Sequence, residues 1–134
     1  MNNVNVNDEN FKNSAVYQEF LSNNQGFGNL LIRAYAANEA IPIKNLRVII
    51  SLPIENVNAI FFDGVTDDSG MIPRLRLPAP VYNSNNLVAP SFTTYDIYAT
   101  YNNKEYNYKV NLYENICVVQ NINVIPEING RVRY

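Results

Sequence analysis

The sequence contains no histidine and no tryptophan, and it has a single cysteine, Cys117. Without histidine, the usual zinc sites and the Ser-His-Asp and Cys-His arrangements of nucleophilic catalysis are excluded. A single cysteine cannot form a disulfide within its own chain. These missing residue types exclude several common classes of enzyme, and we expect a protein that is not an enzyme and that holds no cofactor and no metal.

Charged residues are also scarce. They make up 16% of the chain, with a net charge of −2. Proteins that bind nucleic acids do so largely by neutralising phosphates with lysine and arginine, so we expect no nucleic-acid partner. No run approaches the roughly 20 apolar residues of a membrane span, and the N-terminus lacks the basic and apolar regions of a secretory signal. We therefore expect no membrane partner, no signal peptide and synthesis in the cytoplasm.

The residues that are abundant favour β-structure. Valine and isoleucine number 13 each against 9 leucines, and there are 10 tyrosines. β-Branched and aromatic residues suit strands better than helices. A chain of 134 residues fits one domain with tails. Composition and length together predict a single all-β domain.

Alternation of apolar and polar residues predicts seven short strands separated by turns. They cover residues 29–36, 46–52, 59–62, 72–77, 94–101, 107–113 and 116–125. The segment 67–70 (DDSG) predicts a tight turn in which the glycine takes a positive φ, and residues 81–92 predict a long polar loop. Seven strands at this spacing are typical of an antiparallel Greek-key sandwich.

The residues before the strands predict a short helix. Residues 14–22 place Val16, Tyr17, Phe20 and Leu21 at helical spacing, with Asn13 or Ser14 as the candidate N-cap. So short a helix must pack its apolar face against the sandwich or a neighbouring molecule. Residues 1–13 are polar and predict a flexible arm. The expected organisation is an arm and helix over 1–27, a sandwich over 28–126 and a flexible tail over 127–134.

Several segments together carry a resemblance to a known family. They are 28–35 (GNLLIRAY), 38–48 (NEAIPIKNLRV), 62–70 (FDGVTDDSG), 75–80 (LRLPAP), 95–98 (YDIY) and 124–126 (VIP). Over about residues 14–126 the chain resembles the carboxypeptidase-regulatory-like (transthyretin-like) domain, in the clostridial form found near the N-terminus of spore cortex-lytic enzyme precursors. The resemblance implies a seven-stranded sandwich without catalytic residues, used as a folding, binding or assembly module. Since no enzyme segment follows Pro126, we expect a free-standing module.

One acidic cluster is a candidate metal site. Asp63, Asp67 and Asp68 lie within six residues of sequence, and calcium takes carboxylate oxygens as ligands. Their spacing does not match the D-x-[DN]-x-[DN]-G calcium loop, and a plain Asp-x-x-Gly turn needs the same residues. The cluster therefore favours a turn over a metal site.

Tyrosines concentrate in the fifth and sixth expected strands. By alternation, Tyr98 faces the side opposite to Tyr95 and Tyr101. One set would lie in the core, and the other would stack on sugars or contact another subunit; cross-strand pairing without any ligand is the alternative. Cys117 lies in an apolar strand, which favours a buried side chain, and an intermolecular disulfide is the alternative there.

Both ends of the chain alternate apolar and polar residues, as half-buried strands do. Unpaired sheet edges are templates for strand addition, and an arm that adds a strand to the next molecule builds rings or filaments. The short helix and the exposed tyrosine face are further candidate contacts. The subunit-interface candidates are Val4, Val6, Tyr17, Phe20, Tyr98, Ile128, Val132 and Tyr134.

The predicted function is that of a non-catalytic structural protein. We expect a β-sandwich subunit that assembles into a homo-oligomer or homopolymer, as a fibre or layer on a Gram-positive bacterial surface. The endospore is the expected surface, reached after lysis of the cell, with a cell-wall or spore-coat component as a further partner. The alternative is an accessory module that acts on cortex-lytic enzymes or peptidoglycan, with exposed tyrosines as its platform.

Overall fold

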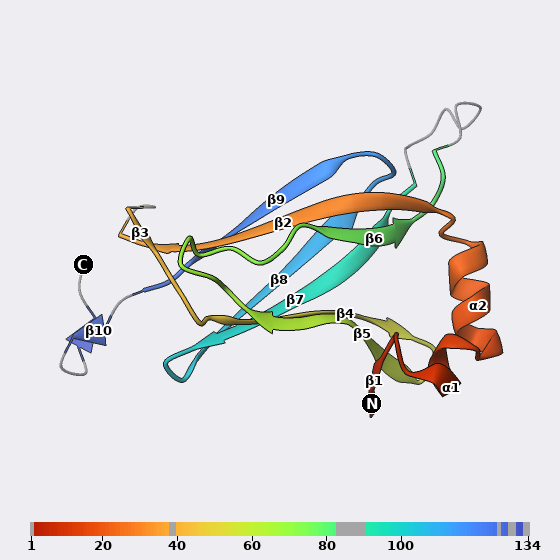
Figure 1. Ribbon diagram of the computed structural model, residues 1–134, viewed down its shortest axis with the longest axis horizontal. Coiled ribbons are helices and arrows are strands. Elements are labelled where there is room, and N and C mark those ends of the chain that lie inside the picture. Colours follow the sequence, from red (N-terminus) through yellow and green to blue (C-terminus); the bar gives the residue numbers. More distant parts are fainter. Residues whose placement is uncertain (1, 38–39, 83–90, 126, 129–130, 133–134) are drawn as a thin grey trace.

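Two β-sheets lie face to face in the computed structural model of the chain (Figure 1), with a cluster of buried apolar side chains as the core. The structure describes residues 2–37, 40–82, 91–125, 127–128 and 131–132. Helix occupies only α1 (Glu9–Lys12) and α2 (Ala15–Ser22) of that part. The predicted β-rich, sandwich-like fold is confirmed at this level.

The first sheet has five strands in the order β1-β5-β4-β7-β8. They are β1 (Asn2–Asn5), β4 (Arg47–Ile54), β5 (Val57–Val65), β7 (Thr93–Tyr101) and β8 (Lys104–Leu112). Neighbours are antiparallel except β1, which pairs with β5 in parallel. Asn102 and Asn103 both have positive φ and form the two-residue turn between β7 and β8, a conformation that hairpins favour.

The second sheet is built around β2 (Gly26–Ala36). One side of β2 pairs antiparallel with β6 (Leu75–Ala79) and β3 (Ile41–Pro42), and the other side pairs in parallel with β9 (Cys117–Asn123). Buried and half-buried residues alternate along the whole of β2, as expected for a strand with one face on the core. A separate hairpin, β10 (Glu127–Ile128) and β11 (Arg131–Val132), lies at the end of the molecule away from the helices (Figure 1).

The strand count and strand directions correct the prediction. Each of the seven predicted strands overlaps one of the seven from β2 and β4 to β9, but β1 and β3 bring the two described sheets to nine strands. The sheets are mixed, not antiparallel, because β1–β5 and β2–β9 are parallel pairs. Alternation at the N-terminus predicted a strand that pairs with another molecule, whereas β1 pairs with β5 of its own chain. β3 has two residues, too few for alternation to reveal. Pairing direction depends on distant segments and is not contained in a local pattern.

The N-terminal segment is folded onto the sandwich and is not a flexible arm over its described residues. Asp8 caps α1 by accepting the N–H groups of Asn10 and Phe11 at 3.0 and 3.2 Å. The buried ring of Phe11 lies 5.0 Å from that of Tyr17. The predicted helix is present as α2, and the Ser14 hydroxyl is its N-cap. Val6, Phe11 and Tyr17 of this segment therefore belong to the core.

A β-bulge in β5 turns two consecutive phenylalanines toward the core. The register with β4 shifts between Ile50 and Ser51, which leaves Phe61 without a partner in the ladder. Such a bulge breaks the alternation of faces, and both Phe61 and Phe62 pack against the core. The Phe61 ring meets the Tyr95 ring edge-on, with centroids 5.2 Å apart. An aromatic cluster thereby joins β5 to β7 beneath α2.

Two tyrosine hydroxyls inside the sandwich differ in their bonding. The hydroxyl of Tyr95, on β7, donates to the carbonyl of Pro78, on β6, at 2.6 Å. This bond ties the two sheets together, and burial raises the pKa of Tyr95 above its ordinary value. The hydroxyl of Tyr106, on the neighbouring strand β8, is buried and has no partner within the described chain.

Candidate functional site

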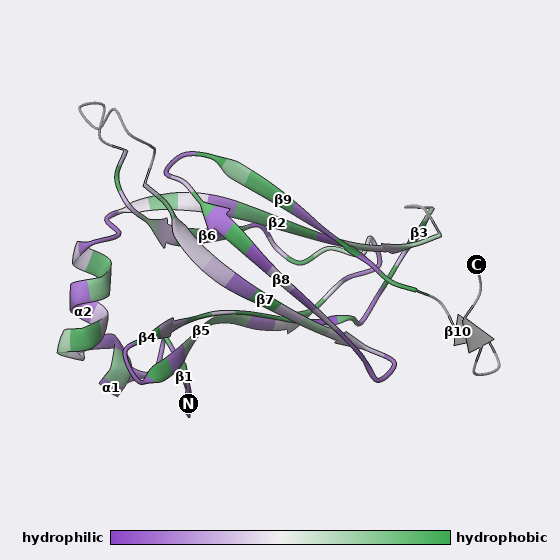
Figure 2. Ribbon diagram, turned by 180° about the vertical axis from the view of Figure 1, so that it is seen from behind, coloured by the Kyte–Doolittle hydropathy of each residue, from purple (hydrophilic) through white to green (hydrophobic). Residues whose placement is uncertain are grey.

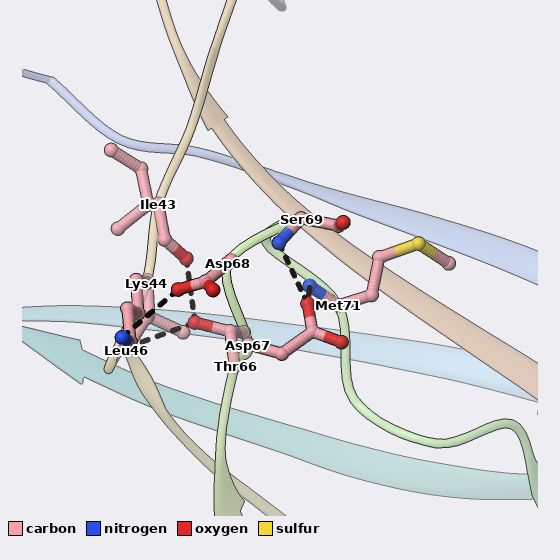
Figure 3. Close-up of polar contacts among 8 residues, drawn as sticks. All are labelled: Ile43, Lys44, Leu46, Thr66, Asp67, Asp68, Ser69 and Met71. Atoms are coloured by element: carbon pink, nitrogen blue, oxygen red, sulfur yellow. Dashed lines mark hydrogen bonds and ion pairs between the residues drawn. The ribbon is translucent and has the colours of Figure 1, made fainter.

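The acidic loop is held by bonds to its own backbone. One carboxylate oxygen of Asp67 accepts the N–H groups of Ser69 and Met71, at 2.9 and 3.1 Å (Figure 3). Gly70 has φ of 74° and donates its N–H to the Asp67 carbonyl at 2.9 Å. A side chain at Gly70 would also meet the carbonyl of Ala34. The predicted tight turn is confirmed, and Asp67 is its structural residue.

A buried threonine fastens this loop to the start of β4. Thr66 is 1% exposed, and its hydroxyl accepts the Leu46 N–H at 3.0 Å and donates to the Ile43 carbonyl at 2.6 Å (Figure 3). Nearby, Lys44 and Asp68 form an exposed ion pair at 2.9 Å. Both contacts are structural, since each joins the acidic loop to the segment that leads into β4.

The third acidic residue has a different partner. Asp63 on β5 accepts two hydrogen bonds from the Arg47 guanidinium, at 3.0 and 2.8 Å. These bonds hold the pKa of Asp63 below its ordinary value. No group of three metal-binding side chains occurs among the residues with described positions.

The outer face of the five-stranded sheet carries a shallow hollow of about 590 Å³. Tyr98 lies in it, and its hydroxyl donates to Glu105 at 3.0 Å, which raises the pKa of that tyrosine. An ion pair between Asp96 and Lys109 borders the same hollow. Tyr95 is buried on the opposite face, as alternation predicted. This face combines one aromatic ring with amide and charged side chains.

The open edge of β9 is the feature that most resembles a contact site. In the described chain β9 pairs only with β2. The Val124 N–H bonds to the Tyr35 carbonyl at 2.8 Å, and the Ile116 carbonyl accepts the Asn29 N–H at 3.0 Å. Successive residues of a strand direct these groups to opposite sides, so the even-numbered residues face β2. The odd-numbered residues Cys117, Val119, Asn121 and Asn123 therefore direct their N–H and C=O groups to the open side.

Exposed apolar side chains gather along this edge. Ile116, Val119 and Ile125 are 50%, 47% and 51% exposed. Beside Ile116, Tyr82 and Tyr113 help to line an apolar hollow of about 550 Å³. Figure 2 shows the first part of β9 as hydrophobic, next to a β8 that carries hydrophilic segments. The exposed apolar residues thus lie within β9 and just before and after it.

Cys117 corrects one prediction. The sequence favoured a buried side chain, but Cys117 is exposed, on the outer face of an edge strand. An apolar stretch in sequence is buried on both faces only when a strand is covered on both, and β9 has a covered inner face alone. Ile122, which lies on the inner face of the same strand, is fully buried.

The other strand edges of the described sheets are protected in recognised ways. β8 carries three charged residues, Lys104, Glu105 and Lys109. β6 contains Arg76 and Pro78. β1 and β3 are short. The sequence of β9, CVVQNIN, contains no charged residue and no proline, so it lacks these protections.

Four predicted interface residues lie in the core of their own chain. Val6 and Tyr17 are buried, and Val4 and Phe20 pack against the core. β1, which contains Val4, is held in the sheet by β5, and the N–H of Val6 continues that contact by bonding to Ile60 at 3.0 Å. These side chains are therefore engaged within one molecule, because the segment adds its strand to its own sheet.

The remaining predicted interface residues fall in three places. Tyr98 lies on the outer face described above. Ile128 and Val132 belong to the paired strands β10 and β11, and Tyr134 lies outside the described residues. Sequence analysis missed β9 as the open edge, although the absence of charge from residues 117–123 was a visible signal.

Comparison with known proteins adds little to this description. No family model matches the chain, and no curated protein matches it. Among solved structures, the chain is similar to catechol 1,2-dioxygenase from Pseudomonas arvilla C-1, with 11% identity and a TM-score of 0.41. The match covers 81% of this chain and 39% of that one. Neither described helix is long and apolar enough to cross a membrane.

Proposed function

We propose that this protein is a non-catalytic structural subunit that associates with copies of itself through the open edge of β9. The observation that carries the proposal is a seven-residue edge strand without charge or proline, flanked by exposed apolar side chains. Unpaired strand edges of this kind pair with strands of other molecules. In the fuller form of the proposal, the assembly is a fibre or layer on a bacterial surface, with the endospore as the candidate surface.

The resemblance to carboxypeptidase-regulatory-like domains supports the same proposal. It would make the chain a seven-stranded Greek-key module extended by β1 and β3, and modules of that family lack catalytic residues. The structural use of the acidic side chains also favours a non-catalytic role, because Asp63 and Asp68 are in ion pairs and Asp67 shapes a turn. Release of the subunit onto that surface by lysis of the cell completes the proposal.

The edge is a better candidate contact than the N-terminal segment. A strand donated to a neighbour must leave its own sheet, and here β1 pairs with β5 along its whole length. Its continuation is buried through Val6 and Phe11. The edge of β9 needs no such rearrangement. A contact through the C-terminal residues Ile128, Val132 and Tyr134 stays a prediction.

A charge placed on the edge tests this proposal. Val119→Lys adds a lysine to an exposed position of β9, and edge lysines prevent pairing because the charge would have to lose water. Light scattering over a range of concentrations, with negative-stain microscopy, should show self-association of the natural chain and its loss in the variant. Val16→Lys is the matched control, since Val16 is 37% exposed on α2, away from β9, and should associate as the natural chain does.

A natural chain that stays monomeric at high concentration would contradict the proposal. The second candidate, an accessory module for peptidoglycan or cortex-lytic enzymes, is favoured by the outer face around Tyr98. Aromatic rings stack on sugars, and amide and charged groups border this one. Co-sedimentation of the monomer with purified peptidoglycan, weakened by Tyr98→Ala, would support that candidate instead.

A further inference from the structure

We propose that two copies of the chain pair in antiparallel fashion along β9, about a two-fold axis that passes beside Gln120. This inference rests on the self-association proposed above and specifies its geometry. The second sheets of the two copies would form one continuous sheet, with the two β9 strands at its centre. The arrangement follows from the direction of the free backbone groups, from charge and from the position of exposed apolar side chains.

The free backbone groups define the possible registers. In an antiparallel pair, residues that exchange hydrogen bonds must both direct N–H and C=O toward the partner. On β9 these are the odd-numbered residues. An axis at Gln120 places Cys117 opposite the second copy's Asn123, and Val119 opposite its Asn121. This register pairs all four open residues of each copy, whereas a shift in either direction leaves some of them unpaired.

One open acceptor already has a bond in the single chain. The side-chain amide of Gln120 donates to the carbonyl of Asn121 at 2.9 Å. A carbonyl oxygen has a second lone pair, so this bond is compatible with an incoming N–H. It also holds the Gln120 side chain along its own strand, beside the proposed axis.

The absence of charge favours a second copy as the occupant. Identical strands that meet about a two-fold axis bring like charges together, which is why a charged edge resists pairing with itself. β9 has no charge to oppose such a contact. β8, on the same side of the molecule, has three charged residues. A two-fold contact also needs only one open edge on each copy, which is what the described chain provides.

An exposed apolar residue near the centre of β9 fits the same register. With the axis at Gln120, Val119 of one copy lies opposite Asn121 of the other, so the two copies of Val119 are diagonal neighbours on the outer face. Val119 is 47% exposed in the single chain. Pairing would remove apolar area of both valines from water, and this burial is favourable.

A contact of this kind closes on itself. Two-fold pairing uses the β9 edge of both copies and leaves no open β9 to continue a chain. It would produce a dimer, and a fibre would require a second, different contact between dimers. The inference therefore separates the first step of assembly from any later one.

Engineered cysteines test the register directly. In a Cys117→Ser background, Gln120→Cys would place two cysteines in a non-hydrogen-bonded pair, with Cα atoms roughly 4.5 Å apart, within the range of a disulfide. Val119→Cys is the matched control, because its two copies would be diagonal neighbours roughly 7–8 Å apart, too far for a good disulfide. After mild oxidation, a non-reducing gel should show several-fold more covalent dimer for Gln120→Cys.

A mixed sample tests the same register without a substitution at the half-buried Gln120, where a changed side chain risks misfolding. Val119→Cys mixed with Asn121→Cys should give a heterodimeric disulfide that neither variant forms alone. Cross-linking of Val119→Cys alone, or no cross-link in any sample that still self-associates by light scattering, would overturn this pairing and leave the proposed function standing. Monomeric scattering in every sample would instead contradict the proposed function.

Discussion

The two sheets of this molecule treat their outermost strands differently. The five-stranded sheet ends on one side in β1, which is short, and on the other in β8, which carries three charges. The second sheet ends in β9, which is uncharged and bordered by exposed isoleucines. A lysine or a proline is enough to protect an edge against strand addition, and the lack of both in β9 is the difference on which the proposed contact rests.

The outer contacts of the two sheets differ as well. In the five-stranded sheet, ion pairs join neighbouring strands: Arg47 to Asp63 and Lys109 to Asp96. In the second sheet, Arg33 of β2 instead donates to the neutral amide of Asn121 on β9, at 3.1 Å. Ion pairs thus cross the outside of the five-stranded sheet, whereas the contact across the β2–β9 pair involves a neutral amide.

The largest effect is expected from Phe11→Ala. Phe11 is buried under the aromatic cluster and anchors the segment that covers the β5 edge. Removing a buried phenylalanine ring should lower the free energy of unfolding by about 3–5 kcal/mol, measured by urea denaturation. Loss of this cover would also give the five-stranded sheet an open edge, so the variant should self-associate even with Val119→Lys present.

Phe92→Ala is the control for that substitution. Phe92 is 46% exposed, and its ring contacts only Tyr113 among the described aromatic rings. Its loss should cost less than about 1 kcal/mol. Equal costs for the two phenylalanines would mean that the N-terminal segment does not stabilise the sandwich.

A smaller effect is expected from Tyr95→Phe, which removes the hydroxyl that joins the two sheets. The carbonyl of Pro78 would stay buried without its donor, and an unsatisfied buried group costs about 1–3 kcal/mol. Denaturant titration of the variant in the Val119→Lys background would measure this loss without interference from self-association.

Tyr106→Phe is the matched substitution for Tyr95→Phe, because it removes a buried tyrosine hydroxyl from the neighbouring strand β8. Its hydroxyl is buried without a described partner, so the substitution should leave the free energy of unfolding unchanged or raise it by up to about 1 kcal/mol. A clear loss of stability would show that the Tyr106 hydroxyl is bonded, for example through a buried water.

Local patterns in the sequence predicted most of the strands because those strands have one buried face. β2, β7 and β8 alternate over nine residues or more, and α2 is marked by its Ser14 cap. The alternation of Val4 and Val6 with asparagines predicted a strand at the N-terminus but not its partner, and α1 escaped prediction because Phe11 is its one apolar residue. The burial of Val6 and Phe11 depends on contacts with β5 and α2. Both elements come later in the chain, so no local pattern predicts this burial.

The candidate site was harder to predict than the fold. That Tyr98 faces away from Tyr95 follows from alternation alone. Which strand lies at an edge follows from pairing between distant segments, and so the exposure of Cys117 and Val119 was not predictable from an apolar run. The absence of charge between residues 117 and 123 was visible, but it gains meaning only once β9 is known to have a free side.

The smallest effect concerns the ion pairs of the five-stranded sheet. Because Arg47 lowers the pKa of Asp63 below its ordinary 3.8, the pair contributes stability above that pH and loses it as the pH falls through the lower, folded pKa. In Asp63→Asn this contribution is absent at every pH. The urea midpoints of the parent and the variant, both carrying Val119→Lys, should therefore differ slightly at pH 7 and converge near pH 2. Asn121→Ala removes the Arg33 contact of the second sheet, and its difference from the parent should not vary with pH, since the amide of asparagine is not ionisable. If Asn121→Ala showed the acid dependence instead, the contrast between the outer contacts of the two sheets would be wrong.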